Sequence, residues 1–299
     1  MAHFPISDDL AQRTIPLWEG PAPLSHGSTP DDTPSLTPFL PKDTGKPASA
    51  LLFIPGGGYM EHGFDAAALK LAENFQQRGI ATFLLRYRLV ADHYRYPVPF
   101  LDGQRAIRLI RHRAVEWNID PAQVALIGFS AGGHLGGLLA THFDSGLPEA
   151  PDPVDRQGSR PDAAVLVYPV ISLQLRLGSA SDLLGPSPDP VLIKKLSVET
   201  QVTSQTPPTL LIHGEDDKIV EVKHSRLMFE ALQKAGISSE FHAYPQGKHG
   251  FGCWTHDPSP EGWLDQMLAW LTLHGFASNQ LDSIPALSPL EFPNRSAIS

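Results

Sequence analysis

The stretch LIGFSAGGHLGG, residues 126–137, ends an apolar run in a serine with glycines on both sides. A regular helix does not favour so many glycines, because each one costs about 1 kcal/mol relative to alanine. Residues 128–132 fit the pattern G-x-S-x-G, which forms a strained turn between a strand and a helix and exposes the serine hydroxyl above the sheet. The stretch therefore predicts a strand, a tight turn at Ser130 and a helix from residue 131.

Apolar runs of strand length alternate with segments of helical spacing from about residue 50 to residue 276. The expected strands are residues 50–55, 80–85, 123–128, 163–169, 208–214 and 239–244, and the expected helices are residues 65–79, 101–118, 131–143, 222–236 and 261–276. Strands that are apolar on both faces, with helices between them, are typical of a parallel sheet covered on both sides. The fold class is therefore predicted to be α/β, with a mostly parallel central sheet and helices on both faces.

Composition shifts suggest one main domain with two flanking segments. Residues 1–48, rich in Pro, Ser, Thr and Asp, are expected to form an irregular N-terminal arm with a strand or two. The domain itself is expected to span residues 49–276. Within it, residues 170–206 break the alternation and are expected to form a short cap at the edge of the sheet. The tail, residues 277–299, is expected to be poorly ordered.

Charge and composition exclude several classes of protein. The 299 residues carry a formal net charge of −9, which argues against nucleic acid or an anionic membrane as a partner. The N-terminus has no signal-peptide pattern, and no apolar run reaches the roughly 18 residues of a membrane helix. We therefore expect a cytoplasmic protein. The chain has a single cysteine, Cys253, so an internal disulfide is excluded. It has 13 histidines, but none of them forms the H-E-x-x-H motif of a metal site, so we expect no bound metal.

A serine hydroxyl becomes a good nucleophile only when a base removes its proton. In this chain order the carboxylate comes after the serine and the histidine comes last. The segment QGKHGFG, residues 246–252, follows the last expected strand and offers His249 as the base. The segment IHGEDDKIV, residues 212–220, also follows a strand and offers three carboxylates. Both loops lie at the carboxyl ends of strands, where open α/β sheets place their sites.

Among the three carboxylates, Asp217 is the preferred partner of His249, because the apolar pair Ile219 and Val220 can anchor the loop behind it. Asp216 is its main rival. His134, four residues after Ser130, and His213, at a strand end, are expected to be structural residues of the core.

The glycine-rich segment IPGGGYMEHG, residues 54–63, follows the first strong strand. Such a loop can turn backbone N–H groups toward a negatively charged oxygen. We expect the N–H groups of Gly57, Gly58 and Ala131 to form an oxyanion hole, with the register among the three glycines at 56–58 left open. Three further side chains near these loops are candidates for substrate contact: Tyr59, His62 and Tyr168.

Several spaced motifs support a family resemblance. They occur in the order PGGGY, YRL, DGQRAIRLIR, WNIDPAQVALIGFSAGGHL, RPDAAVLVYPVIS, TPPTLLIHGEDDKIV and KHGFG. Together they resemble the α/β-hydrolase serine esterases of the acetylxylan esterase and feruloyl esterase type, relatives of the hormone-sensitive-lipase-like carboxylesterases. The resemblance covers about residues 15–276. The lipase-like relatives have H-G-G-G where this chain has P-G-G-G, which fits the xylan-esterase side.

The resemblance implies Ser130 as nucleophile, His249 as base, Asp217 as its carboxylate and no cofactor. The expected reaction is hydrolysis of short-chain carboxylic esters, above all acetyl esters of sugars or xylo-oligosaccharides. The alternatives are a general short-to-medium-chain carboxylesterase, a feruloyl esterase and, further away, a prolyl-oligopeptidase-like peptidase. A non-catalytic binding protein on the same scaffold is the alternative from another class.

Overall fold

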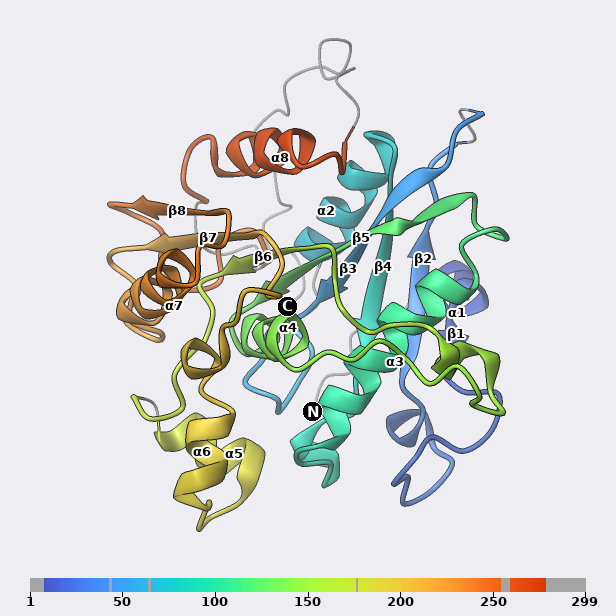
Figure 1. Cartoon of the computed structure of the whole chain (residues 1–299), viewed down its shortest axis with the longest axis horizontal. Helices are drawn as coiled ribbons and strands as arrows, with labels where there is room; N and C mark the ends of the chain where they lie inside the picture. The colour runs from blue at the N-terminus through green and yellow to red at the C-terminus, as the bar shows by residue number, and fades with distance from the viewer. Residues whose placement is uncertain (1–7, 43–44, 64–65, 176, 254–258, 278–299) are drawn as a thin grey trace, which may run out of the picture.

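The structure is a computed structural model that describes residues 8–42, 45–63, 66–175, 177–253 and 259–277. These residues form one sheet with the strand order β1-β2-β4-β3-β5-β6-β7-β8 (Figure 1). The strands are β1 (Ile15–Pro16), β2 (Ser35–Phe39), β3 (Ala48–Ile54), β4 (Ile80–Arg86), β5 (Ile119–Phe129), β6 (Ala163–Val167), β7 (Thr209–Gly214) and β8 (Ser239–Tyr244).

The sheet is parallel from β4 to β8 and antiparallel at the edge made by β1 and β2. β3 is buried from Ser49 to Ile54, and β6 and β7 are buried along their whole length. Their apolar side chains on both faces therefore require cover on both faces. The predicted fold class is confirmed.

Helices cover the two faces of this sheet in separate layers (Figure 1). Helices α3 (Val98–His112), α4 (Ala131–Thr141) and α7 (Lys223–Lys234) pack with Leu52, Ile54 and Leu126 in one core cluster. Helices α2 (Ala66–Gln77) and α8 (Trp263–Leu273) pack with Phe53 and Ile127 in the other. No helix in the described part of the chain is both long and apolar enough to cross a membrane.

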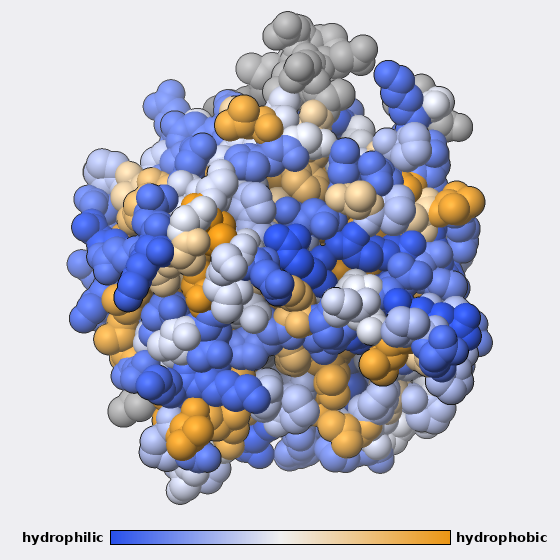
Figure 2. Space-filling view, in the orientation of Figure 1, coloured by the Kyte–Doolittle hydropathy of each residue, from blue (hydrophilic) through white to orange (hydrophobic). Residues whose placement is uncertain are grey.

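The N-terminal arm and the cap segment, residues 170–206, both contain regular secondary structure. The arm contributes the short helix α1 (Asp8–Arg13) and the strands β1 and β2, which pair into the main sheet. Residues 170–206 contain α5 (Leu177–Leu184) and α6 (Pro190–Lys195), which project beyond the sheet at the bottom of Figure 1. Figure 2 shows hydrophobic residues on this projection, where Val191 is 74% exposed. The expected tail from residue 278 lies outside the described residues.

A buried ion pair connects the loop after β4 to α3. The side chains of Arg88 and Asp102 are 1% and 0% exposed, and Nη2 of Arg88 lies 2.6 Å from Oδ1 of Asp102. The backbone N–H of Arg88 donates to Oδ2 of Asp102 at 2.9 Å. Arg88 also donates to the Pro23 carbonyl at 2.7 Å, which attaches the arm to the domain.

We expect Asp102→Asn to lower the free energy of unfolding by about 3–5 kcal/mol, because it leaves the guanidinium of Arg88 buried without a counter-charge. Equilibrium unfolding in urea measures the change. The matched control is Glu116→Gln in the pair Arg113–Glu116, whose closest atoms are 3.8 Å apart with Glu116 61% exposed. That change should cost less than about 1 kcal/mol. Equal costs for the two variants would contradict the prediction.

Candidate active site

The serine turn connects β5 directly to α4. Ser130 has φ 54° and ψ −117°, a strained conformation for a residue other than glycine, and its N–H donates to the Val167 carbonyl at 3.0 Å. A Cβ on Gly128 would lie 2.3 Å from the carbonyl oxygen of Gly132. A Cβ on Gly132 would lie 2.3 Å from the carbonyl oxygen of Pro55. Both glycines are therefore required by the close approach of backbone around Ser130.

Three loops bring Ser130, His249 and Asp217 into one hydrogen-bonded chain. Nε2 of His249 lies 2.8 Å from Oγ of Ser130, and Nδ1 of His249 lies 2.7 Å from Oδ2 of Asp217. The carboxylate can only accept, so Nδ1 carries the proton and Nε2 accepts from the Ser130 hydroxyl. This is the arrangement in which an imidazole removes the proton of a serine nucleophile.

The geometry distinguishes the two candidate carboxylates. Oδ1 of Asp217 accepts the N–H groups of Ile219 and Val220 at 2.8 and 2.9 Å, which turns its Oδ2 toward His249. Oδ1 of Asp216 instead accepts the N–H of Gly247 at 2.7 Å. Of the expected anchor pair, only Val220 is buried, whereas Ile219 is 53% exposed. Asp216 therefore supports the loop of His249 from behind, and Asp217 contacts the imidazole.

A second histidine, treated as structural in the sequence, contacts the same carboxylate. Nε2 of His213 lies 3.4 Å from Oδ2 of Asp217 and 2.9 Å from the Val220 carbonyl oxygen. That carbonyl fixes the proton on Nε2, so Nδ1 accepts from the Ser225 hydroxyl at 2.8 Å. Burial favours a raised pKa for Asp217, but the hydrogen bonds from His213, His249 and the backbone outweigh it and hold that pKa well below its usual range. Asp217 is therefore ionised at neutral pH.

The glycine loop lies against the serine turn. A Cβ on Gly56 would lie 3.1 Å from Cβ of Ser130, so the loop starts beside the Ser130 side chain. Gly57 and Gly58 have φ of +112° and +65°, and the Gly57 carbonyl accepts the N–H groups of residues 60 and 61. Within the described residues, the N–H groups of Gly57, Gly58 and Ala131 have no protein acceptor. They are therefore available to an oxygen bound beside Ser130.

The three candidates for substrate contact have their polar groups on protein partners. Tyr59 is 3% exposed, and its hydroxyl lies 2.8 Å from Nδ1 of His134. Tyr168 is 1% exposed, donates to the Phe251 carbonyl at 2.8 Å and places its ring 4.7 Å from that of His249. Because both tyrosines are buried, they belong to the core beneath the site. His62 is half-buried, with Nε2 2.7 Å from the Tyr87 carbonyl oxygen, and its contact with substrate stays a prediction.

His134 is buried in the core, as the sequence predicted, with its ring nitrogens on Tyr59 and on the Leu196 carbonyl. Burial lowers its pKa from 6.5 to about 4. The unfolded chain therefore binds a proton at higher pH than the folded protein does. Its contribution to stability is present above about pH 6.5 and is lost progressively as the pH falls toward 4.

We expect this histidine to cost about 3 kcal/mol of unfolding free energy between pH 7 and pH 4. Urea unfolding at a series of pH values measures it as the difference between wild type and His134→Gln. That difference should shrink by this amount toward pH 4. His112→Gln, at an exposed position at the end of α3, is the control and should follow wild type throughout. A difference that does not change with pH would contradict the prediction.

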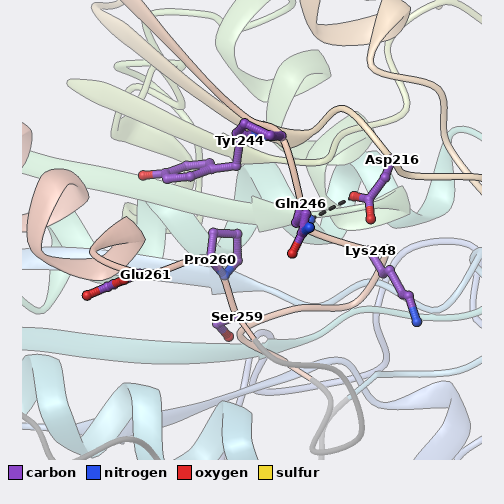
Figure 3. A pocket seen from close by; sticks show the side chains of 9 residues that line it. Asp216, Tyr244, Gln246, Lys248, Ser259, Pro260 and Glu261 are labelled. Atoms are coloured by element: carbon purple, nitrogen blue, oxygen red, sulfur yellow. Dashed lines mark hydrogen bonds between the residues drawn. The ribbon is translucent and has the colours of Figure 1, made fainter.

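A cavity of about 460 Å³ lies behind the loops of Asp217 and His249, and its lining includes neither of these residues nor Ser130. Its lining includes Asp216, Lys248 and the side chains from Ser259 to Glu261 (Figure 3). In Figure 3 the Asp216 carboxylate points to the backbone of the His249 loop. Among the described residues, no group of three or more His, Cys, Asp and Glu side chains is placed to hold a metal.

The mostly parallel sheet, with a serine on a strained turn above it, defines an α/β hydrolase. Residues 36–232 match the BD-FAE family. The acetylxylan esterase of Xylanibacter ruminicola is 33% identical over 86% of this chain and 49% of its own length. The chain therefore belongs to the BD-FAE family of α/β-hydrolase esterases, and the predicted resemblance is confirmed.

Solved structures agree with this family. The acetyl ester-xyloside bifunctional hydrolase of Caldicellulosiruptor lactoaceticus has a TM-score of 0.82 and 41% identity, over 89% of this chain and 97% of that one. The butyrate-bound esterase Est2 of Thermogutta terrifontis has a TM-score of 0.68 and 26% identity, over 83% and 92% of the two chains. The chain spans about half or less of the length of the first curated relatives it matches.

Proposed function

We propose that the protein hydrolyses short-chain carboxylic esters, above all acetyl esters of sugars or xylo-oligosaccharides, through an acyl-serine intermediate. The observation that carries the proposal is the hydrogen-bonded chain of Ser130, His249 and Asp217, with unoccupied N–H groups beside it. The likeness to an acetyl ester-xyloside hydrolase over 89% of the chain supports the acetyl ester as substrate.

In the acylation step, Oγ of Ser130 attacks the ester carbonyl carbon while Nε2 of His249 takes the hydroxyl proton. The tetrahedral intermediate then loses the alcohol, which receives that proton from Nε2. A water molecule next attacks the acyl-serine and gives one proton to His249, which returns it to Oγ as the carboxylic acid leaves. Throughout, the ionised Asp217 stabilises the imidazolium and holds Nδ1–H toward itself.

The carbonyl oxygen becomes negatively charged in both tetrahedral intermediates. The N–H groups of Gly57, Gly58 and Ala131 are proposed to donate to it, and the N-terminus of α4 adds its dipole. Each such donor is worth about 10²- to 10³-fold in kcat. No cofactor is required, because the chain itself supplies the nucleophile, the base and the charge stabilisation.

One observation favours a second candidate function, a general carboxylesterase for short acyl chains. The 26% identical Est2 structure holds butyrate. The complete triad opposes a non-catalytic binding role, and we expect ester cleavage to exceed any amide cleavage of the peptidase kind. The cytoplasmic location expected from the sequence is also a proposal, which fractionation of cells producing the tagged protein would test.

A hydrolysis series tests the proposed substrate. It uses p-nitrophenyl acetate, butyrate and octanoate beside acetylated xylo-oligosaccharide and methyl ferulate, with Ser130→Ala as the blank. A preference for acetyl that extends to the sugar supports the proposal. A preference for butyrate or octanoate, with the acetylated sugar ignored, replaces it with the general carboxylesterase.

A further inference from the structure

A chain of buried polar groups connects the glycine loop to α4 and to the cap segment. The Tyr59 hydroxyl lies 2.8 Å from Nδ1 of His134, and Nε2 of His134 lies 2.9 Å from the Leu196 carbonyl oxygen. The three residues are 3%, 0% and 0% exposed. We call these two hydrogen bonds the Tyr59–His134 bridge, and nothing in the catalytic steps above uses it.

The chemistry of the bridge gives each hydrogen bond one direction. The Leu196 carbonyl can only accept, so Nε2 of His134 carries the proton and donates. Burial keeps His134 neutral above its lowered pKa of about 4, which leaves a lone pair on Nδ1. Tyr59 therefore donates its hydroxyl proton to Nδ1, and burial raises the pKa of that hydroxyl well above 10 so that it stays protonated. The bridge is a fixed, uncharged connection.

The glycine loop has little else to hold it at Gly58. Gly58 is exposed, and on the side where a Cβ would project no atom lies within 4 Å. The next residue, Tyr59, is firmly held. Its φ is 64°, its carbonyl accepts the Val90 N–H at 2.8 Å, and its ring packs edge-on to Tyr87. A left-handed conformation at a residue other than glycine persists only where its surroundings enforce it. The position of Gly58 is therefore set by its two neighbours, by Gly57 through the turn hydrogen bonds of its carbonyl and by Tyr59 through its packing.

The other end of the bridge is attached to the nucleophile. His134 lies one helical turn after Ser130, and its N–H donates to the Ser130 carbonyl at 3.1 Å. The same turn of α4 carries Ala131, the oxyanion donor on that side. The bridge therefore spans from the helix that carries Ser130 and Ala131 to the loop that carries Gly57 and Gly58.

We propose that Tyr59 and His134 are positioning residues that hold the N–H groups of Gly57 and Gly58 at a fixed separation from Ser130 and Ala131. The hydrogen bond from Nε2 of His134 to the Leu196 carbonyl orients the imidazole, and it matters less for the position of the glycine loop than the bond to Tyr59 does. This inference rests on the proposed esterase function. In this proposal Tyr59 does not make the substrate contact that was expected from the sequence. It instead helps to stabilise the transition state indirectly, by holding the glycine loop in place.

The first experiment removes only the hydroxyl, with Tyr59→Phe. Because displaced donors weaken stabilisation of the intermediate more than binding of the ester, kcat for p-nitrophenyl acetate should fall about 10- to 100-fold with KM changed less than about threefold. The affinity of phenylboronic acid, which forms a tetrahedral adduct with Ser130, should fall by a similar factor. Tyr94→Phe is the matched control, since Tyr94 is likewise buried, at 1% exposed, and its hydroxyl accepts the His26 N–H at 2.9 Å in the arm.

The second experiment separates the two hydrogen bonds of His134. His134→Asn keeps an acceptor near the position of Nδ1, and His134→Gln keeps a donor near that of Nε2. His134→Gln should therefore show the kcat loss of Tyr59→Phe, whereas His134→Asn should retain most of the wild-type kcat. Combining Tyr59→Phe with His134→Gln should cost no more than either change alone, because both break the same bond.

The outcomes separate this inference from the proposed function. If Tyr59→Phe loses stability in urea but keeps wild-type kcat and boronate affinity, the bridge serves only the fold and the inference is wrong. The same holds if His134→Asn and His134→Gln lose kcat equally. If the wild-type protein hydrolyses none of the esters and is not labelled by a fluorophosphonate, the proposed function fails and this inference fails with it.

Discussion

Ser130→Ala is expected to lower kcat for p-nitrophenyl acetate by about 10⁴- to 10⁶-fold, because the variant has no oxygen to form the acyl intermediate. The fold should survive, since the required close contacts at the turn are made by the neighbouring glycines and the backbone of Ser130. The measurement is steady-state hydrolysis, with extensive repurification to remove wild-type enzyme.

Two controls accompany this prediction. A fluorophosphonate probe should label wild type at Ser130 and leave Ser130→Ala unlabelled. The unfolding free energy in urea should change by about 1 kcal/mol or less. A variant that folds normally and retains even a tenth of wild-type turnover would show that Ser130 is not the nucleophile.

Asp217→Asn is expected to lower kcat by about 10⁴-fold. The carboxamide keeps the shape of the side chain, and its oxygen can still accept the N–H groups of Ile219 and Val220. Its NH₂ group then faces Nδ1 of His249 and makes that nitrogen an acceptor. The imidazole proton moves to Nε2, which can no longer take the proton of Ser130.

The adjacent carboxylate provides a matched control. Asp216→Asn keeps an oxygen for the Gly247 N–H and touches no triad atom, so it should cost less than about tenfold in kcat, the scale of a single weakened neutral hydrogen bond. The two variants have the same chemistry at neighbouring positions. Comparable losses for both would contradict the assignment of Asp217, and a larger loss for Asp216→Asn would reverse it.

Much of the fold and the hydrogen-bonded arrangement of Ser130, His249 and Asp217 could be predicted because the determining patterns are local. A G-x-S-x-G segment between an apolar run and a helical segment specifies the turn at Ser130, and backbone clashes at Gly128 and Gly132 explain why those positions lack side chains. The histidine follows the last strand by a few residues. Asp217 was preferred over Asp216 because the residues that follow it were expected to anchor its loop. In the structure Val220 is buried, and its N–H donates to the Asp217 carboxylate.

The rest depends on contacts between residues far apart in the chain. β2 pairs with β4 across about 45 residues, and its run SLTPF has no strong strand alternation, so the arm did not look like part of the sheet. The contact of His213 with Asp217 requires the turn after β7 to fold back on its own strand. The burial of Tyr59 depends on His134 of α4, which no local pattern around PGGGY reveals.

The strand order also bears on how activity is acquired. Ser130, Asp217 and His249 follow β5, β7 and β8, and β8 is the outer strand, held by parallel pairing to β7. Such pairings bring distant segments together and form slowly in folding. The imidazole of His249 can reach Ser130 only after β8 has docked, so we expect partly refolded chains to be inactive. On dilution from denaturant, esterase activity should therefore return after helical circular dichroism, and it reports completion of folding.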